Sequence, residues 1–439
     1  MRHLLFFLMI LSSSFISFAQ QFDRVKMDSL FRLIEEHEQG MGSVSLYQNG
    51  EEVYHRAFGF ADAENNIRAT EKTRYRIGSI SKTFTATLIM QLVEEGKLSL
   101  DTPLYSFFPE LPNADKITIK HLLRHRSGLY NFTNKPDYRN WMDQPKTQEE
   151  LLNIFLENGA EFEPGEKFAY SNTNYVLLSF IAEKVANKPF ADILQSQITE
   201  PLQLKHTYFG KKIDSNKEEA LSYYKIEKWE VATETDMSIP MGAGGIVSTP
   251  ADLNTFLVHL LSGKLVSQSS LEQMTTLIDG YGLGLIQMPF YEKKSYGHNG
   301  RIDEFYAMSG YFPEEKFSIA YISNGIGMPV NDIMIAALSI YFGKEYDFPE
   351  FKPALTLSPE LLDQYLGTYG NDSFPLKVTI SREENTLIGQ ATGQASFRLE
   401  AIEENVFQFQ QAGLELEFLP EEKVMMLRQA GTVHHLKRE

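Results

Sequence analysis

The pattern of hydrophobic and polar positions predicts a helix and then a β-hairpin near the start of the chain. From residue 22 to about residue 38, apolar side chains recur at helical spacing and lie on or near one face. Residues 43–47 then alternate, Asn49 and Gly50 give a type I′ turn signal, and residues 52–57 run back. The segment therefore predicts a helix beside two antiparallel strands.

Further patterns predict the rest of a sheet and its helices. Four successive strands are predicted at residues 281–287, 295–298, 307–312 and 317–323. Residues 331–342 predict a closing helix, and the glycine-rich residues 242–245 predict a flexible entry to another strand. Strands near both ends with helical patterns between them indicate an α+β fold, an antiparallel sheet flanked by helices.

The end of the chain has the pattern of a separate small β domain. Proline is frequent in residues 346–358, which predicts a linker after a main domain at residues 22–345. A short helix is expected from Pro359. Period-two alternation follows in five runs, at residues 376–380, 406–410, 414–418, 424–427 and 433–436. Residues 359–439 are therefore predicted to form a small antiparallel, barrel-like domain.

The first residues and the composition predict an exported protein. Residues 1–19 have a basic start, a short apolar core and small residues at the end, which is typical of a signal peptide. The chain of 439 residues contains no cysteine, so disulfides and thiolate metal sites are excluded. Export without disulfides favours a bacterial periplasm. Since the apolar core is too short to span a bilayer, we expect no stable membrane insertion.

The net charge limits the partners. It is −17 at neutral pH, which argues against nucleic acid and against anionic membrane surfaces. The sequence contains no basic run that would reverse this conclusion. We therefore expect a small-molecule or peptide substrate, while the charge leaves the local field of a pocket and the oligomeric state open.

Ser79 and Lys82 form the most informative short motif. A β-type run ends at Gly78, and an apolar helix is predicted from about Ile80 to Glu95. Ser79 thus falls at a helix N-terminus, where free N–H groups and the helix dipole favour negative charge. A serine there can attack a carbonyl, and a lysine three residues on can accept its proton if its pKa is lowered.

The motif alone has ordinary explanations as well. Ser-x-x-Lys occurs a second time, from Ser222 to Lys225, and a serine that opens a helix is usually an N-cap. His121 and His125 lie four residues apart on a predicted helix, a spacing that suits a metal ion. Since no third ligand lies nearby in the sequence, we predict no metal, and the proposed chemistry needs no cofactor.

The Ser79 motif becomes specific because two further motifs follow it along the chain. The three, in order, are Ser79-x-x-Lys82, Tyr170-Ser171-Asn172 and His298-Asn299-Gly300. Together with flanks such as residues 119–129 and 244–253, they resemble the serine β-lactamase and penicillin-binding-protein family, over roughly residues 28–342. The nearer relatives are class C β-lactamases, D-alanyl-D-alanine carboxypeptidases, D-aminopeptidases and esterases. The resemblance implies a β-lactamase-like domain with an additional helical subdomain, followed by a lipocalin-like β domain.

The resemblance also implies roles for the motif residues. Ser79 would attack and become acylated, and Lys82 and Tyr170 would share the general-base work, with the Lys82 cation holding Tyr170 nearer its phenolate form. Asn172 would orient Lys82 and bind the substrate amide. The N–H groups of Ser79 and Arg301 would form the oxyanion hole. In the third motif, Asn299 and Gly300 would line the substrate site, and His298 would face the substrate carboxylate or leaving group.

Two departures from the family pattern lie in the third motif and directly after it. His298 replaces the lysine of many relatives, as in some peptidases and esterases, and Arg301 and Glu304 stand where relatives often have glycine. If positive φ or close backbone approach is required there, the oxyanion strand is altered. Alternatively, Arg301 binds a substrate carboxylate. The sequence leaves both readings open.

The expected function is that of an exported serine hydrolase that cleaves an amide or ester through an acyl-enzyme on Ser79. A D-Ala-D-Ala carboxypeptidase or D-amino-acid peptidase is the favoured type. The alternatives are an esterase or a weak β-lactamase on the same residues, or a non-catalytic protein that binds β-lactams or peptidoglycan. An α/β-hydrolase is disfavoured because Gly-x-Ser-x-Gly is absent from the sequence.

Overall fold

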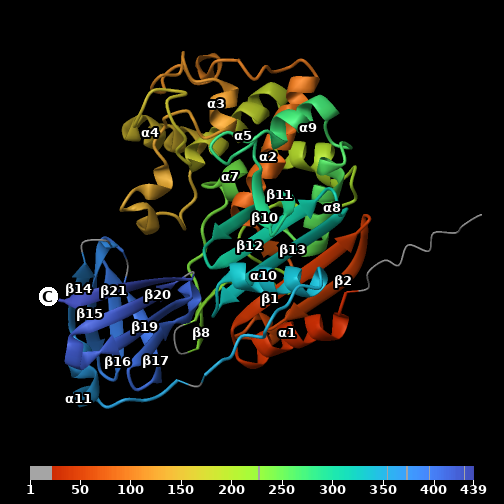
Figure 1. Cartoon of the computed structure of the whole chain (residues 1–439). Coiled ribbons are helices and arrows are strands. Elements are labelled where there is room, and N and C mark those ends of the chain that lie inside the picture. Colours follow the sequence, from red (N-terminus) through yellow and green to blue (C-terminus); the bar gives the residue numbers. More distant parts are fainter. Residues whose placement is uncertain (1–21, 226–227, 353, 372–373, 395, 430) are drawn as a thin grey trace, which may run out of the picture.

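The structure is a computed structural model that describes residues 22–439 apart from residues 226–227, 353, 372–373, 395 and 430. The signal peptide predicted at residues 1–19 lies outside the described residues. Figure 1 shows a large part built from a sheet and helices, with a small β-barrel beside it. Within the described ranges, no helix is long and apolar enough to cross a membrane.

The large part is built on an antiparallel sheet in the order β10-β11-β12-β13-β1-β2. These strands are β1 (Gly40–Gln48), β2 (Glu51–Phe58), β10 (Ile286–Phe290), β11 (Lys293–Ile302), β12 (Phe305–Phe312) and β13 (Phe317–Ile326). The predicted hairpin is confirmed, and both of its turn residues, Asn49 and Gly50, have positive φ as a type I′ turn requires. Ser45 of β1 faces Ala320 of β13, so strands from the two ends of this part lie side by side.

Helices cover both faces of this sheet, as the α+β pattern predicted. On one face, α1 (Arg24–Glu36) packs with α10 (Val330–Tyr341), and on the other α8 (Pro250–Leu261) packs on β12, β13 and β1. Thr249 caps α8 by accepting from the N–H of Asp252, and Pro250 is its first residue. The faces bury separate apolar clusters, which makes the sheet the rigid centre of this part.

A helical subdomain lies on the α8 side of the sheet (Figure 1). Its helices are α2 (Ser81–Glu94), α3 (Ile119–Leu123), α4 (Gln148–Asn158), α5 (Asn172–Ala186), α6 (Phe190–Leu194), α7 (Met241–Gly244) and α9 (Gln268–Thr275). Short strands accompany them: β3 (Phe60–Asp62), β4 (Ile67–Arg68), β5 (Tyr75–Arg76), β6 (Tyr208–Phe209) and β9 (Ile246–Ser248). Two more short strands, β7 (Tyr223–Lys225) and β8 (Trp229–Val231), extend the main sheet, where β7 pairs in parallel with β13 and β8 pairs with β7. Nearly every residue of α2 is buried, so α2 is the central helix of the subdomain.

Two glycine-rich segments differ from the sequence prediction. Strand β10 begins at Ile286 rather than at residue 281, because a Cβ on Gly282 would lie 2.0 Å from the Met274 carbonyl oxygen and Gly284 has a φ of +70° against α2. Residues 241–244 form the short helix α7 instead of a flexible strand entry. In both segments the backbone packs closely against α2, the helix that follows Ser79.

The C-terminal part is a closed antiparallel barrel of eight strands, as predicted. It comprises β14 (Gly367–Asn371), β15 (Phe374–Glu383), β16 (Thr386–Ala391), β17 (Phe397–Glu403), β18 (Val406–Phe409), β19 (Leu414–Leu419), β20 (Val424–Gln429) and β21 (Thr432–Arg438), preceded by α11 (Pro359–Leu362). Tyr365, Phe407 and Phe418 meet in its core. The described residues between α10 and α11 form no helix or strand, and Leu355 donates its N–H to the Ala401 carbonyl of β17.

Candidate active site

Ser79 lies in a single 3₁₀ turn, η1 (Gly78–Ile80), directly before α2. Its side chain does not cap the helix, since neither η1 nor α2 has a side-chain N-cap hydrogen bond. Instead, the Ser79 Oγ atom lies 2.9 Å from Lys82 Nζ and accepts a hydrogen bond from the Tyr170 hydroxyl at 2.9 Å. The structure therefore brings the three predicted catalytic residues together around one oxygen.

Lys82 is fully buried and has three oxygen partners. Besides Ser79 Oγ, Nζ contacts Asn172 Oδ1 at 2.8 Å and the Ala243 carbonyl oxygen of α7 at 2.7 Å. Burial holds the pKa of Lys82 well below its usual value. None of the three partners is a carboxylate that would compensate a positive charge, so the site favours the neutral amine.

A neutral amine at this position is oriented as a base. The amide oxygen of Asn172 and the carbonyl oxygen of Ala243 can only accept, so each takes one of the two N–H groups of neutral Lys82. The remaining lone pair is then directed at Ser79 Oγ, 2.9 Å away. Lys82 is placed to remove the proton of the serine as it attacks.

Tyr170 differs from the prediction in its protonation. Burial raises the pKa of Tyr170, and the hydrogen bond to Ser79 lowers it by less. This direction is opposite to the expected stabilisation of a Tyr170 phenolate by a Lys82 cation. Tyr170 is a neutral donor whose proton lies beside the reacting oxygen, suited to protonating a leaving group.

Asn172 is held in place by the loop at residues 130–146. Its Nδ2 donates to Thr133 Oγ1 at 3.0 Å, and its N–H donates to Asn131 Oδ1 at 2.9 Å. These contacts direct the amide oxygen at Lys82. Asn172 orients Lys82 as predicted, while its binding of a substrate amide stays a prediction.

Backbone of β11 passes very close to the Ser79 turn. A Cβ on Gly300 would lie 2.0 Å from the Ile77 carbonyl oxygen and 3.1 Å from the Ser79 nitrogen. A Cβ on Gly78, whose φ is +51°, would lie 2.7 Å from the Arg301 nitrogen. Only glycine permits this approach. It puts the backbone nitrogens of Ser79 and Arg301 on facing segments, the placement that the predicted oxyanion hole requires.

His298 is buried beside Tyr281. It is 2% exposed, its Nδ1 donates to the Asn299 carbonyl oxygen, and its Nε2 lies 3.0 Å from the Tyr281 hydroxyl. Burial lowers the pKa of His298 to about 4. The predicted contact of His298 with a substrate carboxylate or leaving group stays a prediction. Neutral His298 supports Tyr281, which packs edge-on against Tyr170.

His125, which the sequence suggested only as one of two possible metal ligands, forms hydrogen bonds with the backbone on both sides of Tyr170. Its carbonyl accepts from the N–H of Ala169 at 2.9 Å, and its Nδ1 accepts from the N–H of Ser171 at 3.1 Å. Its ring lies 4.2 Å from the Tyr170 ring, centroid to centroid. The described residues contain no group of three or more His, Cys, Asp or Glu side chains that could hold a metal. Sequence reasoning missed this role because the contacts are tertiary.

A cleft of about 350 Å3 opens at Ser79. The loop at residues 130–146 supplies one wall, with Phe132, Tyr138 and Met142, and charged side chains lie along the other side, at Arg301, Asp303 and Glu304, with Arg139 opposite. Asp303 is held by Arg76 at 3.0 Å and by Thr235. The cleft can therefore hold a small acyl group with both apolar and charged features.

Comparison with known proteins decides the family. The sequence model of the Beta-lactamase family matches residues 28–338, most of the chain. The chain belongs to the Beta-lactamase family. As the broader serine β-lactamase and penicillin-binding-protein-like group implies, it is a serine hydrolase.

Solved structures in this family match over long stretches. An octameric penicillin-binding protein homologue from Pyrococcus abyssi is 27% identical, with a TM-score of 0.67, over 94% of this chain and 100% of that chain. The D-amino acid amidase from Ochrobactrum anthropi SV3 is 28% identical, with a TM-score of 0.65, over 73% of this chain and 99% of that chain. Teichoic acid D-alanine hydrolase from Staphylococcus aureus (strain MRSA252) is 29% identical over 56% of this chain and 59% of that protein.

The departures from the family pattern at Arg301 and Glu304 leave the strand intact. Neither residue has a positive φ. Asp303, which lies between them, has a φ of 52°. Positive φ is therefore not needed at Arg301 or Glu304, and Gly78 accommodates the close backbone approach at Arg301. Arg301 has a side chain that is 58% exposed and lies 3.2 Å from Glu304, so its guanidinium is available at the cleft.

Proposed function

We propose that this protein is an exported serine hydrolase that cleaves an amide or ester bond of a D-amino-acid compound through an acyl-enzyme on Ser79. A D-Ala-D-Ala carboxypeptidase or D-amino-acid peptidase is the favoured type, with the bacterial periplasm as its location. The observation that carries the proposal is the position of Ser79 Oγ between the amine of Lys82 and the hydroxyl of Tyr170.

The chemistry follows from these contacts. Neutral Lys82 takes the Ser79 proton as Oγ attacks the carbonyl carbon, and the N–H groups facing the turn stabilise the oxyanion. The C–N or C–O bond then breaks, and Tyr170 protonates the leaving group while Lys82 returns a proton to Tyr170. A water molecule hydrolyses the ester on Ser79 by the reverse sequence, releasing the acid.

The substrate class is supported by two kinds of observation. Two of the relatives described above are named for D-amino-acid compounds, one as a D-amino acid amidase and one as a teichoic acid D-alanine hydrolase. In the cleft, the exposed guanidinium of Arg301 is suited to a terminal carboxylate. We propose that Arg301 binds the carboxylate of a C-terminal D-amino acid.

A substrate panel tests the proposal. Peptides ending in D-Ala-D-Ala, D-amino-acid amides, D-alanyl esters and a cephalosporin are compared by kcat/KM, each beside its L-isomer where one exists. We expect turnover of a D-amino-acid peptide and none by Ser79→Ala. Turnover of simple acyl esters alone indicates the esterase. Failure on the whole panel, with no acylation of Ser79, indicates the binding protein.

Export has its own test. The motif at residues 1–19 predicts cleavage after Ala19. We expect the mature protein to begin at Gln20 and to appear in the periplasmic fraction of an expressing Gram-negative host. A full-length protein retained in the cytoplasm contradicts export without bearing on the chemistry.

A further inference from the structure

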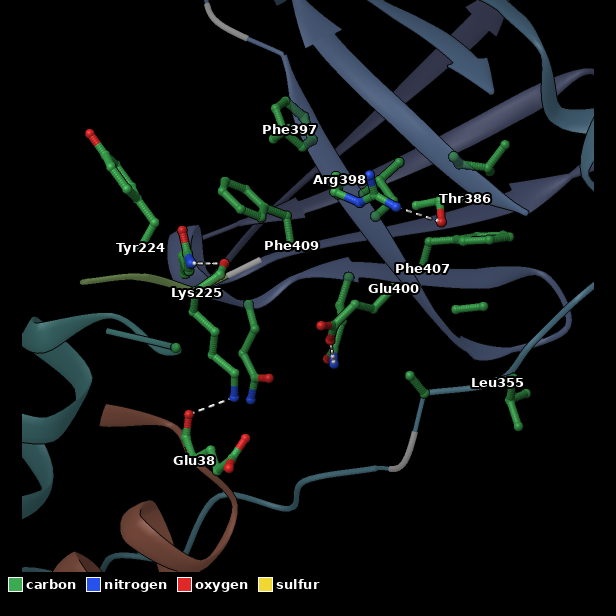
Figure 2. Close-up of a pocket in the computed structure, with 18 of the residues that line it drawn as sticks. Glu38, Tyr224, Lys225, Leu355, Thr386, Phe397, Arg398, Glu400, Phe407 and Phe409 are labelled. Carbon is green, nitrogen blue, oxygen red and sulfur yellow. Dashed lines mark hydrogen bonds between the residues drawn. The ribbon is translucent and has the colours of Figure 1, made fainter. Parts of the chain in front are cut away.

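A second cavity, larger than the catalytic cleft, lies between the barrel and the large part of the molecule. Its volume is about 760 Å3, within the range of ligand sites. Figure 2 shows its walls, with Phe397, Phe407 and Phe409 on the barrel strands, Leu355 on the segment before α11, and Lys225 on the side of the large part.

The apolar side of this cavity is not covered by the chain itself. Phe397 and Phe409 stack at 4.9 Å between ring centroids, and Phe407 lies deeper, in the barrel core. Leu355 is 45% exposed at the rim, although its backbone is fixed by the hydrogen bond to Ala401. The exposed Leu355 and the stacked pair of rings leave apolar surface open on the cavity wall, which is typical of a surface that contacts a ligand.

The polar side of the cavity selects among ligands. Most of its polar side chains are neutral: Gln39, Thr356, Asn385, Thr386, Ser396, Gln408, Gln410 and Gln411. Its three carboxylates, Glu38, Glu304 and Glu400, outnumber its two cations, Lys225 and Arg398. An acidic lining repels a polyanion, and the many polar side chains of the lining disfavour a lipid chain. A neutral peptide, with amide groups and small side chains, satisfies both sides.

The cavity adjoins the catalytic cleft. Tyr224 and Glu304 line both of them. Glu304 lies three residues after Arg301 and pairs with it at 3.2 Å, so the edge that begins at the oxyanion strand leads directly to the cavity. The Tyr224 side chain is 40% exposed between the two spaces. A chain held at Ser79 can therefore extend along this edge toward the barrel.

We propose that the cavity between the barrel and the large part is a subsite for the peptide portion of the substrate remote from the scissile bond. The inference rests on the proposed function and deepens it. The substrate is then a peptide of several residues, and the barrel takes part in choosing it. A free D-amino-acid amide reaches only the catalytic cleft.

Length preference tests this proposal. The kcat/KM values of a D-Ala-D-Ala dipeptide and a pentapeptide with the same end are compared, as are D-alanyl amide and a D-alanyl peptide lengthened on the leaving-group side. The variants are Leu355→Ser, which removes the apolar rim, and Ala354→Trp, which narrows the cavity from an exposed position. Val433→Ser is the matched control, because Val433 is 43% exposed on β21 and does not line the cavity.

We expect the full chain to prefer the longer member of at least one pair, and both cavity variants to reduce that preference roughly tenfold while Val433→Ser retains it. In a Ser79→Ala background, the affinity for the uncleaved pentapeptide falls in the same variants. A length preference that is absent, or that survives both substitutions, overturns the inference while leaving the proposed function intact. Absence of any D-amino-acid turnover overturns the proposed function itself.

Discussion

At the scale of single residues, the site is governed by burial without compensating charge. Lys82 is surrounded by amide and carbonyl oxygens, and the pKa of Lys82 is lowered by burial. The pKa of Tyr170 is raised by the same cause. Both shifts favour the neutral forms, in which Lys82 can act as a base and Tyr170 as an acid around Ser79.

The first prediction concerns Lys82. Activity should rise with pH through the lowered pKa of Lys82, because only the unprotonated amine accepts the serine proton. Lys82→Arg should lose about 10²- to 10⁴-fold in kcat, since a guanidinium stays protonated. The measurement is the pH profile of kcat/KM from about pH 4 to about pH 10, the range in which a lowered lysine pKa is looked for. An arginine variant with an unchanged profile contradicts this role.

The second prediction concerns His125. The asparagine of His125→Asn keeps an acceptor for the Ser171 N–H and tolerates the positive φ of 54°, whereas His125→Phe keeps only the ring. If the hydrogen bond positions Tyr170, His125→Asn retains more kcat than His125→Phe, with KM little affected in both. His125 acts here through Tyr170 as a positioning residue.

Thermal unfolding of the same two variants provides the control for folding. A loss of kcat that follows only the unfolded fraction, equally in both, would reduce His125 to a packing residue. A kcat difference at temperatures where both variants are folded supports the positioning role.

The third prediction concerns stability and His298. The pKa of His298 is lowered from 6.5 to about 4 in the folded protein, so the unfolded state binds more protons between these values. The stabilisation is present above pH 6.5 and is lost as the pH falls toward 4. Urea unfolding at several pH values should show His298→Gln to be less acid-sensitive over this window. An equal slope in both proteins contradicts a neutral His298.

At the scale of elements, the close approach of β11 to η1 builds the oxyanion site. The fourth prediction is that Gly300→Ala lowers kcat by about 10²-fold or more, because its Cβ forces β11 away from the Ser79 turn. Gly370→Ala in the barrel is the control, since its Cβ meets nothing closer than 3.4 Å and its φ is negative. Full activity in Gly300→Ala would show that this approach is not needed.

The sequence was most informative where local signals and function coincide. The hairpin at Asn49-Gly50 and the triad of Ser79, Lys82 and Tyr170 were both predicted. The states of these groups were not, because desolvation depends on tertiary packing. For the same reason, the prediction did not include the contact of His298 with Tyr281 or the hydrogen bond between His125 and the Ser171 N–H.

At the scale of the whole molecule, the barrel has a hydrophobic core of its own. Leu416 is fully buried in it and belongs to neither cluster of the large part. The fifth prediction is that Leu416→Ala destabilises the barrel by about 2–5 kcal/mol and shifts one of two transitions in calorimetry. A single transition that moves as a whole would show that the two parts unfold as one unit.

The most direct test of the account is the intact mass of the mature protein after incubation with benzylpenicillin, followed by peptide mapping. The account predicts one covalent adduct per chain, located on Ser79, absent from Ser79→Ala and strongly slowed in Lys82→Arg. A protein that hydrolyses its substrate yet carries the adduct on another residue, or keeps it in Ser79→Ala, contradicts the assignment of Ser79 as the nucleophile.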